Sequence, residues 1–197
     1  MQVFPTDVLT KVLNDQTIDL KNALNDIFIS YAHIDNEALT EEDKGWISHF
    51  HKVLDTRVAQ LTGEKPRIWR DLKLGGNDVF DEAIVNQFCN TRIMISIMSP
   101  RYFKSEWCMK ELKQFYDNAS STGGVSFENK SRILKVVKTP FETNDVPNEI
   151  QGVFSRILGF EFFEVDTDTG KFMEYNASFG ADAKHNYFSK IFDLAHE

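Results

Sequence analysis

The chain has 197 residues, of which 42% are hydrophobic and 13% aromatic, and its formal net charge is −8. This length and composition predict one folded domain with a sizeable core and exclude a largely disordered chain. The negative charge, without a block of lysine and arginine, argues against a nucleic-acid groove or an anionic membrane surface as the main partner. A small anionic ligand remains compatible, because it needs only a few local cations or backbone amides.

The two cysteines and the apolar runs bear on the cellular compartment. Cys89 and Cys108 lie in apolar helical contexts and form no CxxC pair, which favours buried thiols over a disulfide or a metal site. The opening stretch "MQVFPTDVLTKVLNDQ" contains acids and a proline, unlike a signal peptide. No apolar run approaches the roughly 18 residues that a membrane span needs. We therefore expect a cytoplasmic protein without a membrane segment.

Apolar periodicity divides the chain into a short extension and one domain. The segment 1–24 has apolar residues at helical spacing and predicts an N-terminal helical extension, so the domain covers 25–197. Within it, short apolar runs predict strands over 26–32, 67–71, 92–99, 132–139 and 160–166. Helices are predicted over 47–61, with Gly63 as the stop signal, over 77–90, after Ser105 as the N-cap, from Pro147, and over 185–197.

This alternation predicts an α/β fold: a five-stranded, doubly wound parallel sheet of flavodoxin-like strand order with helices on both faces. Ligands of such sheets bind beyond the carboxyl ends of the strands. The first predicted strand ends in Tyr31, Ala32 and His33, and the third ends at Ser99. The segments 33–43, 119–131 and 166–182 are polar and are predicted to be loops.

The helix after Ser105 carries the residues of greatest interest. Trp107 and Glu111 are separated by four positions and are expected side by side, on the flank of the apolar stripe that begins at Cys108. There, loss of the Glu111 carboxylate would leave no buried cavity. An aromatic plane beside a carboxylate could hold a flat cationic ring and a ribose hydroxyl. The alternative is a solvated surface glutamate paired with Lys104 or Lys110, as is common on helix flanks.

Several other chemistries lack their motifs. The loop "RDLKLGGND" after the second predicted strand has neither a GxGxxG nor a P-loop pattern, and on its own reads as a surface turn. His33, His49 and His51 do not form a metal-binding set, so no metal site is predicted. There is no GxSxG nucleophile elbow.

Three stretches, in order along the chain, resemble the boxes of a TIR (Toll/interleukin-1 receptor) domain of the bacterial, NAD-cleaving type. "DIFISYAHID" is similar to the first box, "RDLKLGG" to the second-box loop, and "SPRYFKSEWCMKEL" to the third-strand and helix signature. The resemblance extends from about residue 26 to residue 194. It is looser near the end, where such domains often carry Phe-Trp and this chain has "NYFSKIFDL".

The resemblance implies an NAD+ nucleosidase that cleaves the bond between nicotinamide and ribose. It implies Glu111 as the catalytic carboxylate, four positions after Trp107. Substrate contacts are implied for Trp107, Tyr31, Ala32, His33, Ser99, Lys73 and Asn77. NAD+ would be the substrate, with no further cofactor, and the product could be ADP-ribose or a cyclic isomer. A role in bacterial defence or signalling is also implied.

The resemblance further implies activation by self-association through the 73–78 loop, and a fused or separate sensor domain as partner. Many TIR domains act instead as non-enzymatic scaffolds through homotypic assembly, so this alternative stays open. A nucleoside transferase of related topology is a third reading. It would need a second carboxylate or nucleophile in the cleft, and we locate none from the sequence.

Overall fold

The computed structural model describes residues 25–41, 43–70, 91–121, 124–127, 130–146, 148–154, 157 and 159–197. Outside the described residues lie the predicted helices over 1–24 and 77–90, the 73–78 loop with Lys73 and Asn77, Cys89, and Pro147.

Strands and helices are interspersed along the described residues. The strands are β1 (Asn25–Tyr31), β2 (Ile68–Arg70), β3 (Thr91–Met98), β4 (Ser126–Phe127), β5 (Lys130–Ser131), β6 (Ile133–Val137), β7 (Gly159–Glu161), β8 (Phe163–Val165) and β9 (Phe172–Glu174). The helices are η1 (His33–Asn36), α2 (Trp46–Thr62), α4 (Pro100–Phe103), α5 (Glu106–Ser121), η2 (Thr143–Asp145), α6 (Asn148–Phe154) and α7 (Gly180–His196).

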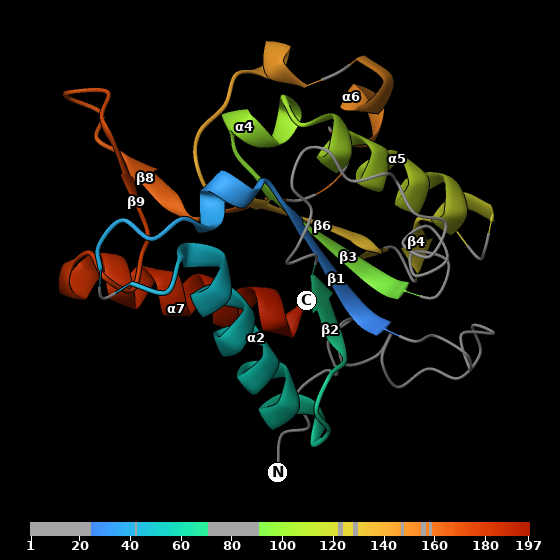
Figure 1. Cartoon of the computed structure of the whole chain (residues 1–197), viewed down its shortest axis with the longest axis horizontal. Helices are drawn as coiled ribbons and strands as arrows, with labels where there is room; N and C mark the ends of the chain where they lie inside the picture. The colour runs from blue at the N-terminus through green and yellow to red at the C-terminus, as the bar shows by residue number, and fades with distance from the viewer. Residues whose placement is uncertain are drawn as a thin grey trace.

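The main sheet has five strands in the order β2-β1-β3-β6-β7, and all of its pairings are parallel. Taken in chain order, this is the 2-1-3-4-5 arrangement of flavodoxin-like folds, so the predicted fold class is confirmed. Helices α2 and α7 cover one face of the sheet, and α4, α5 and α6 lie on the other (Figure 1).

The alternation of side chains along the central strands creates two separate cores. Ile27 and Ile29 of β1 pack in the core beneath α2 and α7, whereas Phe28 packs in the core beneath α4 and α5. Strand β3 alternates in the same way, and both strands are buried along nearly their whole length. Two-residue periodicity therefore places Ser30, a polar residue, on the α5 side of a buried strand.

Helix ends are fixed by local and distant groups. Gly63, predicted to stop the first helix, adopts a left-handed conformation with φ of 78°, and its N–H donates to the carbonyl of Ala59. At the other end of α2, the side chain of Asn36 accepts a hydrogen bond of 2.8 Å from the backbone N–H of Ser48. This contact places η1 against the start of α2. The predicted cap of α5 is confirmed, since the Ser105 hydroxyl accepts from the N–H of Cys108 at 3.3 Å.

The carboxyl-terminal third differs from the prediction. The strand expected over 160–166 is two strands: β7 joins the main sheet, and β8 pairs antiparallel with β9 in a separate hairpin. The chain turns at the buried Phe162, whose N–H donates to Val137 and whose carbonyl accepts from Tyr175. Strand β9 lies inside the predicted loop 166–182. Backbone pairing, which composition does not reveal, decides this division.

Other predicted boundaries also shift. The segment 33–43, predicted as a loop, begins with the helix η1, and 119–131 contains the two-stranded hairpin of β4 and β5. The last helix begins at Gly180, earlier than the predicted 185, because the buried Ala183 extends its apolar stripe by a turn.

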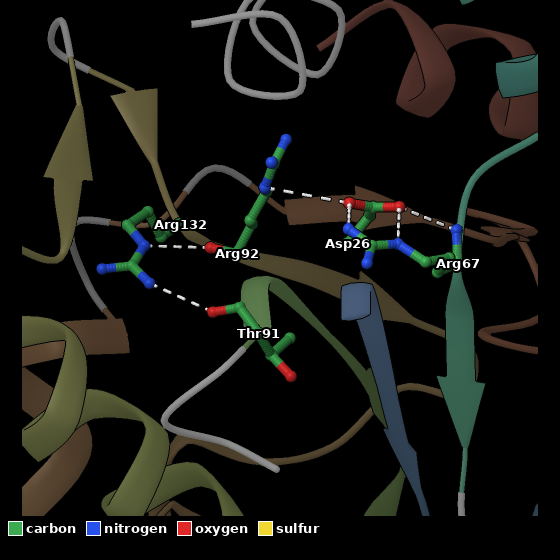
Figure 2. Close-up of polar contacts among 5 residues, drawn as sticks. All are labelled: Asp26, Arg67, Thr91, Arg92 and Arg132. Atoms are coloured by element: carbon green, nitrogen blue, oxygen red, sulfur yellow. Dashed lines mark hydrogen bonds and ion pairs between the residues drawn. The ribbon is translucent and has the colours of Figure 1, made fainter. Parts of the chain in front are cut away.

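A cluster of ion pairs and hydrogen bonds joins the amino ends of the strands (Figure 2). The Asp26 carboxylate accepts from the backbone N–H of Arg67 at 2.8 Å and from its guanidinium at 3.0 Å. Arg92 lies 3.8 Å from the same carboxylate. These contacts tie β1 to the residue before β2 and to β3.

Arg132 makes a second set of contacts at the amino edge of the sheet. Its side chain is buried and donates to the carbonyls of Arg92 at 2.9 Å, Thr91 at 3.2 Å and Gly124 at 3.3 Å. The guanidinium also lies over the ring of Phe115 in α5, 5.6 Å from its centroid. The arginine therefore fastens the start of β6 to the start of β3 and to the end of α5.

We predict that Arg132→Met lowers the free energy of unfolding by about 2–4 kcal/mol, because each buried acceptor left without a donor costs about 1–3 kcal/mol. Urea denaturation of the full chain measures the effect. Lys113→Met is the matched control, since it breaks the exposed Lys113–Asp117 pair of 2.7 Å and should cost below about 0.5 kcal/mol. Equal losses for the two variants would contradict a special role for Arg132.

Candidate functional site

The carboxyl edge of the sheet gathers polar side chains from elements that are distant in sequence. β1 ends at Tyr31 and leads into η1, β3 ends before Ser99, and β6 ends before Lys138. Because the strands are parallel, all these ends meet at one edge. The site is therefore formed by the segments that come directly after β1, β3 and β6, together with the helices α4 and α5 that return over the sheet.

Glu111 is buried at this site. It lies on α5 with only 3% of its surface exposed. The hydroxyl of Ser30, from β1, donates to Oε2 of Glu111 at 2.5 Å. The expected flank position is thus wrong, and so is the alternative of a solvated surface glutamate. The helix is turned so that Glu111 shares the buried face with Cys108 and Leu112.

Ser30 also meets Tyr102 of α4. The two hydroxyl oxygens are 3.2 Å apart, and the tyrosine is fully buried. Burial raises the pKa of Tyr102 well above its ordinary value, with a smaller contribution from Cys108. The phenol therefore stays protonated at ordinary pH and can act as a hydrogen-bond donor. Tyr102, Ser30 and Glu111 form a chain of polar contacts across three elements, which we call the Glu111 chain.

Cys108 lies one turn before Glu111 and is inert. Burial, and next the nearby Glu111 carboxylate, raise the pKa of the Cys108 thiol to about 12. A neutral thiol is a poor nucleophile and a poor metal ligand. The prediction of a buried, unpaired thiol is confirmed for Cys108.

A second carboxylate, Asp35, stands at the same edge and was not located from the sequence. Ser99 donates its hydroxyl to Oδ2 of Asp35 at 2.6 Å and accepts from the N–H of Tyr102 at 3.2 Å, so it also caps α4. Burial raises the pKa of Asp35, and the Ser99 hydrogen bond opposes that rise. The signal in the sequence was weak: a single acid shortly after a strand end, in a polar segment.

Lys138 and Glu174 form a third polar contact that the sequence did not suggest. Their side chains are 2.7 Å apart and largely buried. The Lys138 ammonium also lies 5.9 Å from the ring centroid of Trp46. This pair joins the end of β6 to β9 and so holds the β8–β9 hairpin beside the carboxyl edge. No local pattern marks it, because the partners are 36 positions apart.

The β8–β9 hairpin gives the carboxyl edge a lateral boundary (Figure 1). Besides the Lys138–Glu174 pair, the Trp46 indole N–H donates to the carbonyl of Tyr175 at 2.8 Å and fixes the hairpin to α2. Both contacts are largely buried, so they are shielded from solvent and resist competition from salt. The hairpin also presents apolar side chains to solvent, namely Val165, Phe172 and Met173.

The other residues that were predicted to contact the substrate differ in burial and in the face of the sheet on which they lie. Tyr31 is buried in the core beneath α2 and α7, while Ala32 is buried in the core beneath α4 and α5. His33 is exposed, and its ring stacks on that of Tyr31 at 5.6 Å. Trp107 is half-buried in the first turn of α5. The structure thus brings Ser99 and Ala32 to the Glu111 side of the sheet and turns the Tyr31 side chain to the opposite face.

Two general features concern metals and membranes. Within the described ranges, no group of three or more His, Cys, Asp or Glu side chains is arranged to hold a metal ion. None of the helices in this part of the chain is long and apolar enough to cross a membrane.

Comparison with known families identifies the class of protein to which the chain belongs. The family model described as TIR domain matches residues 27–127, which include most of β1, the Glu111 chain and β3. The chain belongs to the TIR domain family. It matches no curated protein.

Two solved structures are similar to the chain at low identity. One is the TIR domains of the activated Roq1 resistosome directly recognizing the pathogen effector XopQ, with 15% identity, a TM-score of 0.40, and coverage of 87% of this chain and 83% of that chain. The other is a metazoan TIR-STING receptor from C. gigas in complex with 2',3'-cGAMP, with 15% identity and a TM-score of 0.44. There the match covers 88% of this chain and 40% of the receptor chain.

We predict that Cys108 resists alkylation by iodoacetamide in the native protein at pH 8 and reacts within minutes in urea. The reason is its burial together with a pKa of about 12. The measurement is mass spectrometry of a Cys89→Ser variant, so that only one thiol is counted. Rapid labelling of the folded variant would show that the thiol is accessible and ionisable.

Proposed function

We propose that this TIR domain cleaves NAD+ at the bond between nicotinamide and ribose, with Glu111 as the catalytic carboxylate. The observation that carries the proposal is the buried carboxylate of Glu111, held by a hydroxyl at the carboxyl edge of a TIR-family sheet. Ligands of α/β sheets bind at this edge, and a carboxylate there can stabilise positive charge that develops on a bound ligand.

The chemistry requires one negative group. When the C1′–N bond of NAD+ breaks, its electron pair moves to the nicotinamide nitrogen, which becomes neutral, so no acid is needed for the leaving group. Positive charge develops on the ribose, as in other glycosidic cleavages. A carboxylate close to that ribose stabilises the charge, and it does so more strongly where water is excluded. Water then adds to C1′ and releases a proton, giving ADP-ribose; attack from the adenine gives a cyclic isomer.

Burial of Glu111 has a consequence for regulation. A side chain that is 3% exposed must become accessible before it can contact a substrate. We include in the proposal that self-association through the 73–78 loop, outside the described residues, favours a form in which Glu111 is uncovered and keeps its bond to Ser30. Lys73 and Asn77 of that loop, with Trp107, Ala32, His33 and Ser99, are proposed to contact NAD+. Tyr31, whose side chain faces the other core, would contribute through its backbone.

A non-enzymatic scaffold is the second candidate, and the same burial supports it. A glutamate that is enclosed and bonded to Ser30 can serve packing alone. The two functions differ in what removal of the charge does to NAD+ cleavage. A role in bacterial defence or signalling and a partner sensor domain belong to either version of the proposal.

We predict that Glu111→Gln lowers the rate of nicotinamide release from NAD+ by at least about 100-fold, since loss of one group that stabilises the transition state costs about 10²–10³. The glutamine amide has nearly the same shape and can still accept from Ser30, so the melting temperature should move little. Chromatography of released nicotinamide and thermal melting should be run on the same samples.

Glu106→Gln is the matched control for this experiment, because Glu106 is exposed on the same helix. It should leave the rate unchanged. Glu111→Ala is less informative than the glutamine variant, because it empties a buried position and should also lower the melting temperature. Full activity of Glu111→Gln would remove the catalytic role and leave the scaffold.

We predict that specific activity rises with protein concentration, because assembly is proposed to expose the site. Leu74→Asp should flatten that rise, since a charge in the suspected contact opposes association. Nicotinamide release over a range of protein concentrations, alongside sedimentation of the same samples, measures the coupling. A rate per molecule that does not depend on concentration would indicate an enzyme that acts as a monomer.

A further inference from the structure

The hydrogen bonds of the Glu111 chain have a defined direction. Ser30 has one hydroxyl hydrogen, and the 2.5 Å contact with the Glu111 carboxylate uses it. The 3.2 Å contact between the Ser30 and Tyr102 hydroxyls must then have Tyr102 as donor. The order is therefore Tyr102 to Ser30 to Glu111.

The members of the chain sit on elements that cannot easily move apart. Ser30 is in β1, the strand between β2 and β3, and is 1% exposed. Tyr102 is in α4, whose start is capped by Ser99. Glu111 is in the second turn of α5. A glutamate side chain has three rotatable bonds, so a donor anchored in the sheet fixes where its carboxylate lies.

We propose that Ser30 is a positioning residue that holds the Glu111 carboxylate in its reactive geometry, and that Tyr102 orients the Ser30 hydroxyl for this purpose. This inference rests on the proposed NAD+ cleavage. Ser30 engages one carboxylate oxygen, Oε2.

The neighbouring strand supplies a matched control. Ser96 of β3 is the register partner of Ser30 and lies on the same face of the sheet. It is fully buried and lies near the Tyr102 hydroxyl, but its own hydroxyl makes no hydrogen bond of good geometry among the described residues. Ser96→Ala thus removes the same atom from an equivalent environment and leaves the Ser30–Glu111 bond in place.

The test compares kcat and KM for nicotinamide release in variants of the full chain, at a protein concentration where the wild type is active. We expect Ser30→Ala to lower kcat by about 10–100-fold, because a misplacement of about 1 Å can cost that much, with KM changed less than about 3-fold. Tyr102→Phe should lower kcat by a smaller factor. Ser30→Thr, which keeps the hydroxyl, should recover part of the loss, and Ser96→Ala should behave as the wild type.

A double variant separates positioning from packing. Ser30→Ala should have no further effect on kcat in a Glu111→Gln background, because residues that act as one unit are not additive. An additive loss, or an equal loss in Ser96→Ala, would overturn the inference. An unchanged kcat in Ser30→Ala would also overturn the inference. A raised kcat would overturn it too, because it would show that the bond restrains Glu111 instead of positioning it for the reaction. If Ser30→Ala does not fold, an unchanged kcat in Tyr102→Phe would overturn the inference, because it would show that Tyr102 does not orient the Ser30 hydroxyl for the reaction.

Activity of the wild type and of two variants distinguishes the positioning role of Ser30 from the proposed NAD+ cleavage. Loss of activity in Glu111→Gln with no effect of Ser30→Ala would leave the NAD+ cleavage standing and remove the positioning role. Absence of nicotinamide release from the wild type at any concentration would remove both.

Discussion

The bond between Ser30 and Glu111 satisfies a general requirement. A carboxylate can be buried in a protein interior only where hydrogen-bond donors contact it, because an unpaired buried charge is costly. Here the donor stands on a central strand of the sheet, in a position where the alternation of side chains points it at α5. The helix is rotated so that Glu111 faces this hydroxyl, and Cys108 and Leu112 face the core with it. The burial of the Glu111 carboxylate and of the Cys108 thiol follows from this rotation.

The two edges of the sheet differ in the polar contacts that they carry. At the amino edge, Asp26 and Arg132 bind guanidinium, amide and carbonyl groups from the starts of neighbouring strands (Figure 2). Parallel strands cannot be joined by a short hairpin, and a long crossover connection does little to fix their register. The contacts at the amino edge therefore hold the strand starts in register. At the carboxyl edge the polar contacts are pairs of side chains from different elements, Ser30 with Glu111 and Ser99 with Asp35.

The sequence by itself determined several local features: the positions of β1, β2, β3 and β6, the burial of the central strands on both faces, the Ser105 cap, the Gly63 stop and the parallel α/β class. These features arise from periodicity and from short-range hydrogen bonds, which act over a few residues. The sequence placed Glu111 and Trp107 on one helix through their spacing, and the TIR resemblance implied their roles. It did not determine that Glu111 is buried, that the strand expected over 160–166 divides in two, or that Tyr31 and Ala32 enter opposite cores.

Only the tertiary structure decided which groups meet. Ser30 and Glu111 are 81 positions apart, Ser99 and Asp35 are 64 apart, and Lys138 and Glu174 are 36 apart. A strand's period of two shows that Ser30 shares a face with Phe28, but not which helix lies over that face or how it is turned. Strand order and helix rotation come from the packing of whole elements. The partners of the buried polar groups therefore became known only when those elements were in place.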